Sequence, residues 1–500
     1  MQPQRKTDLS AAATGIAGLD SVLRGGLTPN RLYLVEGMPG SGKTTLAMQF
    51  LMTGARAGEP VLYVTLSETD EELRAVAESH GWNLDGVTVH EVVPTEESLR
   101  SEEQYTVFHP SEVELTQTTQ RILSEVERVK PKRIVFDSLS EMRLLAGSAL
   151  RYRRQILAMK RYFSGRSCTV IMLDDLTAVE RDLQVQSIAH GVILLEQLNP
   201  EFGAEHRRLR VVKFRGVAFR GGYHDYNILR GGLEVFPRLV AAEHRQHFDG
   251  ETLASGIVEL DGLLGGGIEQ GTSTLIAGPP GTGKSSLAAR FANSALLQGK
   301  RAAMFVFDEN IQTLLRRTKG LGSDLQPHLE SGSLTIQQVD PAELTPGEFA
   351  QAIRRSAEDH NADVIVIDSL NGYMQAMPDE RNLTTQLHEL LTYLAQLNTA
   401  TILISGHQGL IGSNMQAPVD ASYLADTVLL LRYFEAEGSV RQAISVVKKR
   451  SGAHERTIRE YKLEAGAIRV GDPLVRFRGV LTGVPIYDGG GGTLMESRKE

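Results

Sequence analysis

The feature that most constrains this chain is that it repeats itself. The block TGIAGLDSVLRGG at residues 14–26 returns as SGIVELDGLLGGG at residues 255–267, 241 positions later. Further pairs follow in the same order: GMPGSGKT with GPPGTGKS, LYVTLSET with AMFVFDEN, RIVFDSLSE with VIVIDSLNG, and LRVVKFRG with ISVVKKRS. The conserved order excludes coincidence, and so long a period indicates duplicated domains rather than a solenoid of small repeats.

The duplication sets the number of domains. A length of 500 residues by itself suggests about three domains, but two copies of one unit account for it. We therefore expect a first domain at residues 1–240, a second at 241–485 and a flexible C-terminal tail at 486–500. The polar stretch 241–255 is typical of a linker between the two domains.

Each copy alternates short apolar runs with helical stretches. RLYLVEG, PVLYVTL, RIVFD and CTVIML in the first copy are rich in Val, Ile and Leu, which is typical of parallel strands buried on both faces. Amphipathic segments such as DEELRAVAESHG separate them, and STLIAG, RAAMFVF, DVIVIDS and TILISG repeat the pattern. The sequence therefore predicts two α/β domains with mostly parallel central sheets.

Both copies carry the motif G-x-x-x-x-G-K-[ST] between an expected strand and an expected helix. Its glycines let backbone N–H groups curl around phosphate oxygens, and the helix N-terminus adds a favourable dipole. We expect Lys43 and Lys284 to contact the β- and γ-phosphates of ATP, and Thr44 and Ser285 to bind Mg²⁺. The alternative is a glycine-rich turn with a surface lysine, and recurrence at the repeat spacing argues against it. The expected nucleotide-binding residues are Gly37, Gly40, Ser41, Gly42, Lys43, Thr44 and Thr45, and Gly278, Gly281, Thr282, Gly283, Lys284, Ser285 and Ser286.

An aspartate ends a matching apolar run in each copy. These residues are Asp137 and Asp368, each followed by Ser-Leu. An acid at the carboxyl end of a central parallel strand lies beside the phosphate loop, where it can hold Mg²⁺ through water. We therefore place both aspartates with Thr44 and Ser285 in the expected metal sites. The alternative is that each aspartate caps the helix that follows it.

Carboxylates also follow the strand after the first helix of each copy. They are Glu68 in the first copy, and Asp308 and Glu309 in the second. In one class of ATPases a carboxylate at this place orients or deprotonates the attacking water, so all three are candidate catalytic residues; the alternative is that they cap the next helix. The first copy has Ser67 where the second has Asp308. If that position lies nearest the water, the first domain hydrolyses ATP more slowly.

A Lys-x-Arg pair lies late in each copy on an apolar, alternating stretch. The pairs are Lys213 with Arg215, and Lys448 with Arg450. Such cations can act on a neighbouring subunit's nucleotide, as an arginine finger does, or they can protect an exposed strand edge. Recurrence in both copies favours the first interpretation.

The strand TILISG is followed by two polar residues, His407 and Gln408. A polar side chain at such a strand end can sense the γ-phosphate. We align Asp174 and Asp175 of the first copy with this pair, so the two copies differ at this place.

Composition and charge exclude several classes of protein. The single cysteine, Cys168, rules out an intramolecular disulfide and a zinc site of several thiolates, which fits a reducing cytoplasm. The N-terminus lacks the apolar core of a signal peptide, and no stretch has the apolar length of a membrane helix. A net charge of −8 argues against a nucleic-acid partner, although residues 151–163 are basic and either contact nucleic acid or form a solvated helix face.

With these motifs the chain resembles the KaiC family of two-domain, RecA-like ATPases. The resemblance covers about residues 14–480 and includes SYLADTVLLLRYFE at 422–435 and KKRSGAHERTIRE at 448–460. It implies two tandem RecA-like P-loop NTPase domains that bind ATP with Mg²⁺ at the subunit interfaces of a homo-hexameric double ring. It also implies that Lys448 and Arg450 reach the neighbour's ATP, and that the ring has regulatory protein partners, which the sequence does not identify.

The clock protein of this family phosphorylates itself on adjacent Ser and Thr residues in its second domain. Those positions match Ser422 and Tyr423 here, so Ser422 is a candidate phosphoacceptor, and Tyr423 departs from the family pattern. We expect a cytoplasmic ATPase, with serine/threonine autokinase activity as a weaker hypothesis, in signalling or clock-like regulation. The alternatives are a RecA-like motor that depends on nucleic acid and a scaffold that binds nucleotide for assembly.

Overall fold

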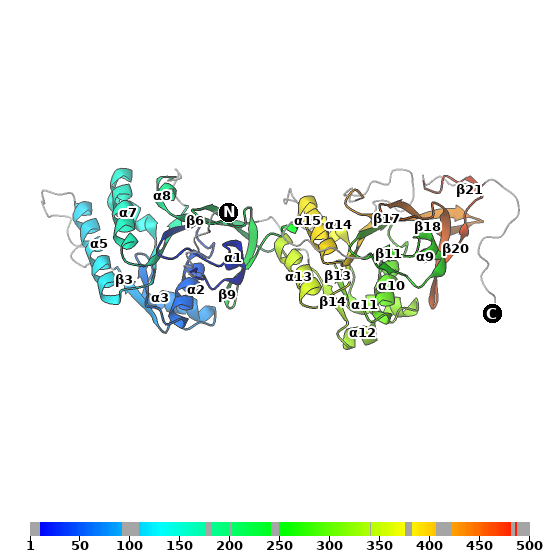
Figure 1. Ribbon diagram of the computed structural model, residues 1–500, viewed down its shortest axis with the longest axis horizontal. Coiled ribbons are helices and arrows are strands. Elements are labelled where there is room, and N and C mark those ends of the chain that lie inside the picture. Colours follow the sequence, from blue (N-terminus) through cyan, green and yellow to red (C-terminus); the bar gives the residue numbers. More distant parts are fainter. Residues whose placement is uncertain are drawn as a thin grey trace, which may run out of the picture. The chain divides into compact units, whose positions relative to one another are not determined.

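The alternation of apolar runs and helices folds into two α/β units. The computed structural model describes residues 11–92, 110–176, 183–199, 203–241, 250–340, 342–375, 383–406, 422–481 and 486–487. By its internal contacts the chain divides into Met1–Arg238 and Leu239–Glu500 (Figure 1). His407, Gln408 and residues 488–500 of the expected tail lie outside the described residues.

A nine-stranded sheet forms the centre of the first unit, in the order β3-β2-β4-β5-β1-β6-β7-β8-β9. The six strands from β3 to β6 run parallel, and β7, β8 and β9 continue the sheet in antiparallel pairs. The bounds are β1 (Leu32–Gly37), β2 (Val61–Thr65), β3 (Val87–Glu91), β4 (Arg133–Asp137), β5 (Thr169–Asp175), β6 (Gly191–Leu198), β7 (His206–Phe214), β8 (His224–Leu229) and β9 (Gly232–Phe236). The parallel part is the one that the apolar runs predict, so the expected fold class is confirmed.

Helices cover both faces of this sheet. Because side chains alternate along a strand, Tyr33 and Val35 of β1 face one apolar core while Leu32 and Leu34 face the other. On the first face lie α1 (Ala17–Val22), α2 (Lys43–Arg56) and α3 (Asp70–Ser79). On the second lie α5 (Pro110–Val129), α6 (Leu139–Ala146), α7 (Ala149–Ser164) and α8 (Leu183–Ile188).

The second unit repeats the topology strand for strand. Its sheet has the order β14-β13-β15-β16-β12-β17-β18-β19-β20. The strands from β14 to β17 run parallel, and β18, β19 and β20 continue the sheet in antiparallel pairs. The bounds are β12 (Ser273–Gly278), β13 (Ala302–Val306), β14 (Leu334–Gln338), β15 (Val364–Asp368), β16 (Ala400–Gly406), β17 (Thr427–Ala436), β18 (Ser439–Lys449), β19 (Ile458–Glu464) and β20 (Ala467–Pro473). Small two-stranded sheets pair β10 (Thr252–Leu253) with β11 (Ile268–Glu269), and β21 (Phe477–Arg478) with β22 (Ile486–Tyr487). Strand β10 lies within the stretch that we expect to be a linker.

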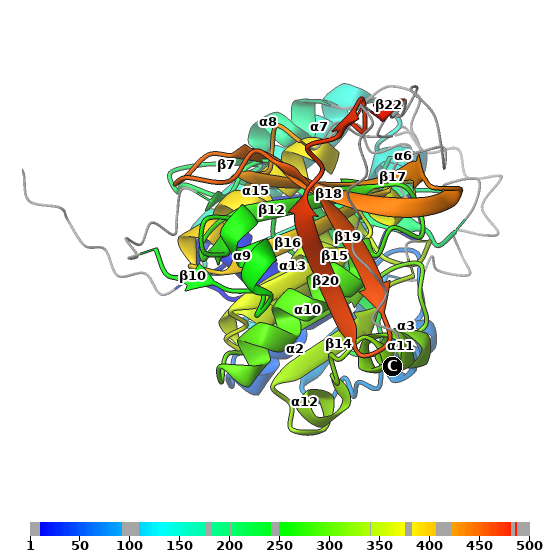
Figure 2. The same ribbon diagram turned by 90° about the vertical axis from the view of Figure 1, so that its right-hand side faces the viewer.

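The helices of the second unit also divide between two cores. One core includes α9 (Val258–Leu263), α10 (Lys284–Leu297), α11 (Ile311–Gly320) and α12 (Gln326–Glu330). The other includes α13 (Pro346–Glu358), α14 (Leu370–Gln375) and α15 (Leu383–Gln396). Figure 2 shows β19 and β20 beside α10 and α11, where Tyr461 donates to the Gly283 carbonyl and the Gly466 N–H donates to the Gly320 carbonyl.

Cys168 lies just before β5 and is 2% exposed. Burial raises the pKa of its thiol to about 12, so it is a protonated core residue, as the sequence suggests. Among the described residues, no helix has both the length and the apolar character needed to cross a membrane.

Candidate nucleotide-binding sites

The glycine loop of each unit joins a buried strand to a buried helix. In the first unit β1 ends at Gly37 and α2 begins at Lys43, and in the second β12 ends at Gly278 and α10 begins at Lys284. The second and third glycines of each motif have φ between 79° and 88°, a left-handed conformation that side chains rarely adopt; they are Gly40 and Gly42, and Gly281 and Gly283. A Cβ at Gly37 would lie 2.4 Å from Ser41 Oγ, so the first glycine is required for space.

The loop has the properties of an anion cradle. A glycine at each helix N-cap, Gly42 and Gly283, offers no side-chain oxygen to the first N–H groups of the helix, which leaves these donors for a ligand. Ser41 is fully buried, and within the described chain its Oγ has no hydrogen-bond partner. These residues therefore fit a bound phosphate. Thr45 of the first unit is also buried, as are Thr282 and Ser286 of the second, and Thr282 Oγ1 donates to the Pro279 carbonyl over 2.9 Å.

The two loop lysines have different partners. Lys43 Nζ donates to the carbonyls of Gly37 and Met38 over 2.9 and 3.0 Å, and it also lies 2.7 Å from Asp175 Oδ1. Lys284 Nζ donates to the Pro279 carbonyl over 2.7 Å, and burial lowers its pKa.

Strand register explains this difference and corrects one expectation. Gly37 of β1 is paired with Asp175 of β5, whereas Gly278 of β12 is paired with Gly406 of β16. Asp175 therefore corresponds to Gly406. Our alignment of Asp174 and Asp175 with His407 and Gln408 is wrong by two positions, because strand pairing rather than local similarity sets the match. Asp174 instead pairs with Arg143 of α6 over 2.6 Å.

The strand-end aspartates reach the loops, as predicted. Thr44 Oγ1 donates to Asp137 Oδ2 over 3.2 Å, and Ser285 likewise hydrogen-bonds to Asp368. Burial raises the pKa of both carboxyl groups. The helix-cap alternative is wrong for Asp137, because Ser138 holds the N-cap position of α6. The peptide bond after each aspartate is cis.

Asp137 has one hydrogen-bond partner, Tyr63, that was not predicted from the sequence. The Tyr63 hydroxyl on β2 donates to Asp137 Oδ2 over 2.5 Å. The matching residue of the second copy is Met304, which cannot donate a hydrogen bond.

Glu68 is half-buried between β2 and α3. Its Oε2 is buried and has no hydrogen-bond partner among the residues that the structure describes. Burial and then the charge of Asp137 raise its pKa, and Lys43 and Asp175 also act on it. The cap alternative is wrong here, because Thr69 is the N-cap of α3 and forms a capping box with Glu72.

The two acids of the second unit are both engaged. Asp308 accepts a hydrogen bond from Ser369 Oγ over 2.9 Å. Glu309 accepts two from Arg317 of α11, over 3.1 and 2.6 Å. Asn310 is the N-cap of this helix, so neither acid is its cap. Arg317 was not among the predicted site residues. The signal for it is a difference between the copies, because Val76 stands at the matching position.

The hydrogen bonds of the two Lys-x-Arg pairs go to groups away from the phosphate loop of their own unit. Lys213 Nζ donates to the carbonyls of Gln186 and Ser187 at the end of α8, and Arg215 also donates to the Ser187 carbonyl. Among the strands that the structure describes, this end of β7 pairs with β6 alone, so the edge-protection alternative is still open.

The second pair has the same arrangement around Ser422. Lys448 Nζ donates to the carbonyls of Ser422 and Ala425 over 2.8 and 2.7 Å, and Arg450 donates to the carbonyl of Tyr423 and to Asp426. Ser422 itself is exposed.

The fold and these two loops define a class of protein: a P-loop NTPase with two tandem RecA-like units. A family model described as "ATPase: KaiC" matches residues 12–240 and again residues 253–475. The chain belongs to the KaiC family of ATPases, and the resemblance seen in the sequence is confirmed.

Individual relatives are distant but cover nearly the whole chain. The chain is 27% identical to the circadian clock oscillator protein KaiC of Parathermosynechococcus lividus over 478 residues, which cover 94% of this chain and 87% of the relative. It is 25% identical to the circadian clock protein KaiC3 of a Synechocystis strain over 497 residues, which cover 97% of each.

Proposed function

We propose that both units bind and hydrolyse ATP, and that the protein works as a nucleotide-dependent hexameric double ring. The observation that carries the proposal is the doubled cradle: a glycine loop, a buried lysine at its end, and a hydroxyl that bonds to a strand-end aspartate. The glycine loop and the lysine bind phosphate, and the hydroxyl with the aspartate is the donor set that Mg²⁺ prefers.

Each residue then has a role in the bound state. The loop N–H groups and Lys43 or Lys284 would hold the phosphates, while Thr44 with Asp137, and Ser285 with Asp368, would hold Mg²⁺. Mg²⁺ supplies charge neutralisation at the β- and γ-phosphate oxygens. In the first unit Glu68 accepts a proton from the attacking water. Its buried Oε2, which has no hydrogen-bond partner in the described chain, supports this role.

The ring explains the Lys-x-Arg pairs. In a ring the nucleotide of one subunit lies against the next, so Lys213 with Arg215, and Lys448 with Arg450, complete the neighbour's site. The bonds of both lysines to backbone carbonyls hold them in place. The names of the relatives support a role in clock-like regulation or signalling, with protein partners.

Autophosphorylation of Ser422 is a further part of the proposal. Ser422 is exposed, and its backbone is held by the lysine that would reach the neighbour's ATP. Mass spectrometry after incubation with ATP and Mg²⁺ tests this step. An unmodified Ser422 in a sample that turns over ATP would remove it.

The main test combines mass and hydrolysis. We expect a six-subunit mass with ATP and Mg²⁺ and a smaller mass without them. Lys43→Ala and Lys284→Ala should each lower hydrolysis by the altered unit by about 10²–10³-fold, and Lys300→Ala, which removes a lysine paired with Glu251, should not. If neither loop variant changes hydrolysis or assembly, the phosphate-loop assignment fails. If both loop variants change assembly but not hydrolysis, the protein is a scaffold that binds nucleotide for assembly.

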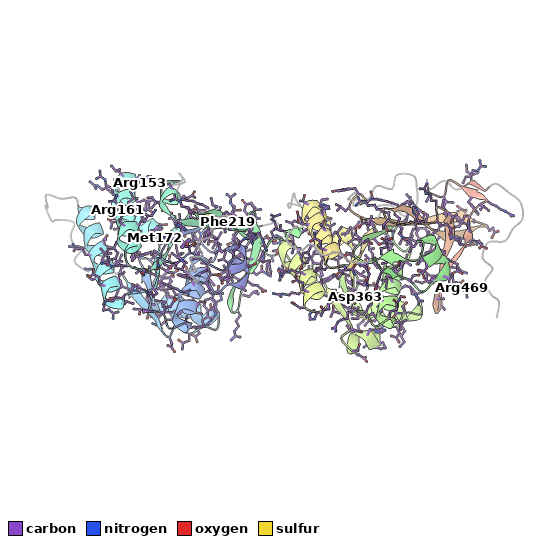
Figure 3. All side chains as sticks on the ribbon, viewed as in Figure 1. Arg153, Arg161, Met172, Phe219, Asp363 and Arg469 are labelled. Atoms are coloured by element: carbon purple, nitrogen blue, oxygen red, sulfur yellow. The ribbon has the colours of Figure 1, made fainter. Side chains whose placement is uncertain are left out.

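One observation favours a nucleic-acid motor as the second candidate. Helix α7 carries five cations and no acidic residue, and Figure 3 labels two of them, Arg153 and Arg161. Strong stimulation of hydrolysis by single-stranded DNA would support the motor and contradict a purely regulatory ring.

A further inference from the structure

Arg317 forms an unusual connection in the second unit. It projects from α11 and binds both carboxylate oxygens of Glu309, with Nε 3.1 Å from Oε1 and Nη2 2.6 Å from Oε2. Its remaining nitrogen, Nη1, donates to Ser286 Oγ. One guanidinium thus joins the carboxylate after β13 to the first turn of the phosphate-loop helix α10.

This connection is partly shielded from water. The Arg317 and Glu309 side chains are 30% and 24% exposed, and Ser286 is buried. The other charged groups of the site are Asp308, which accepts from Ser369, Lys284 on α10 and Asp368 at the end of β15. Both Arg317 and Glu309 act electrostatically on Asp368. Two-point guanidinium binding to a carboxylate is both strong and directional, so Glu309 is held toward α11.

The first unit lacks this restraint. The position that matches Arg317 is Val76, and the position that matches Ser286 is Thr45. Glu68, the counterpart of Glu309, keeps a buried Oε2 without a partner in the described part of the unit. The same backbone therefore presents an available carboxylate in one unit and an occupied one in the other.

ATP hydrolysis needs a carboxylate that is available as a proton acceptor. It forms a bond between the water oxygen and the γ-phosphorus, breaks the bond from that phosphorus to the β-phosphate oxygen, and moves a water proton to a base. A carboxylate whose two oxygens both bind a guanidinium is held in that direction and does not turn toward the water.

We infer that Arg317 is a positioning residue that withholds Glu309 from the attacking water, so that the second unit keeps its ATP longer than the first. This inference rests on the proposed ATPase function. It assigns the slow site to the second unit, contrary to the expectation that the missing acid at Ser67 makes the first unit slower.

The test isolates the second unit by using Lys43→Ala as the background. Arg317→Val, which installs the residue of the first unit, should raise kcat by at least about tenfold, since a released base contributes about 10²–10⁴-fold. The gain should appear in kcat and leave the KM for ATP unchanged, because Lys284 and the loop glycines are intact. Arg316→Val is the matched control: this neighbouring arginine is exposed, and its removal should change neither value.

A double-mutant cycle keeps the test decisive. Glu309→Gln, measured alone as the reference, should cancel the gain of Arg317→Val when the two substitutions are combined, and a gain that persists in the double variant overturns the inference. If Arg317→Val does not fold, Arg317→Lys, which keeps the charge but cannot hold both oxygens, replaces it. An unchanged or lower kcat overturns the inference. If the background loses no further activity with Lys284→Ala, the proposed ATPase function of the second unit has failed instead.

Discussion

Asp175 offers the sharpest quantitative prediction. Its carboxylate lies 2.7 Å from Lys43 Nζ, the nitrogen that is expected to contact the γ-phosphate. ATP must therefore displace Asp175 from Lys43, and it must then place its own negative charge beside that carboxylate. Both effects weaken binding, so Asp175→Asn should tighten ATP binding to the first unit.

The structure sets the size of the effect. A hydrogen bond between charged groups contributes about 1.5–3 kcal/mol. The Asp175 side chain is 28% exposed and that of Lys43 is 8% exposed, so solvent screening reduces this to about 1–2 kcal/mol. At 1.4 kcal/mol per tenfold, we expect Kd to fall by about 5- to 30-fold.

The assay is calorimetric titration with a non-hydrolysable ATP analogue in a Lys284→Ala background, which silences the second unit. The second unit provides a reciprocal experiment: Gly406→Asp, in a Lys43→Ala background, should weaken binding. The nearest described atom to a Cβ at Gly406 is Asn371 Nδ2, at 3.6 Å, so the described surroundings accept the substitution. Unchanged or weaker binding by Asp175→Asn would refute the competition between Asp175 and phosphate.

Three other expectations concern the first unit. Glu68→Gln should lower its kcat by about 10²–10⁴-fold while ATP still binds; because burial raises the pKa of Glu68, the wild-type rate should begin to fall, as pH is lowered, at a higher pH than for an ordinary glutamate. Equal rates for the two proteins would remove Glu68 as the base. Tyr63→Phe should cost about 1–3 kcal/mol in urea unfolding, since it removes a donor from the buried Asp137 carboxylate; a neutral result would mean that water replaces the hydroxyl. Thr69→Ala should cost about 1 kcal/mol by loss of the α3 cap, with Thr69→Ser as the control that keeps it.

Much of the fold could be predicted because it depends on local patterns. Strands such as Leu32–Gly37 are apolar on both faces, and only a sheet covered on both sides buries such a strand. The duplication then fixed the same topology for both units. The antiparallel extension β7 to β9 was not predicted, since its alternating residues fit either an edge hairpin or a continuation of the main sheet.

The contacts within the candidate sites were also predictable only in part. The contact between Thr44 and Asp137 followed from the rule that carboxyl ends of parallel strands meet at one edge. The contacts of Lys43 with Asp175 and of Arg317 with Glu309 did not. The first depends on the register between β1 and β5, and the second on how α11 is rotated about its axis. A sequence motif specifies neither the strand register nor the rotation of the helix.

The burial of Cys168 has a practical consequence for labelling chemistry. A thiol that is 2% exposed and protonated at neutral pH reacts slowly with maleimides, and the chain has no other cysteine. One cysteine introduced at an exposed position then carries a dye or cross-linker without prior removal of the native thiol. Val212 and Val447 are 43% and 48% exposed beside Lys213 and Lys448. A probe at either position would report directly on whether these strands meet a second copy of the chain.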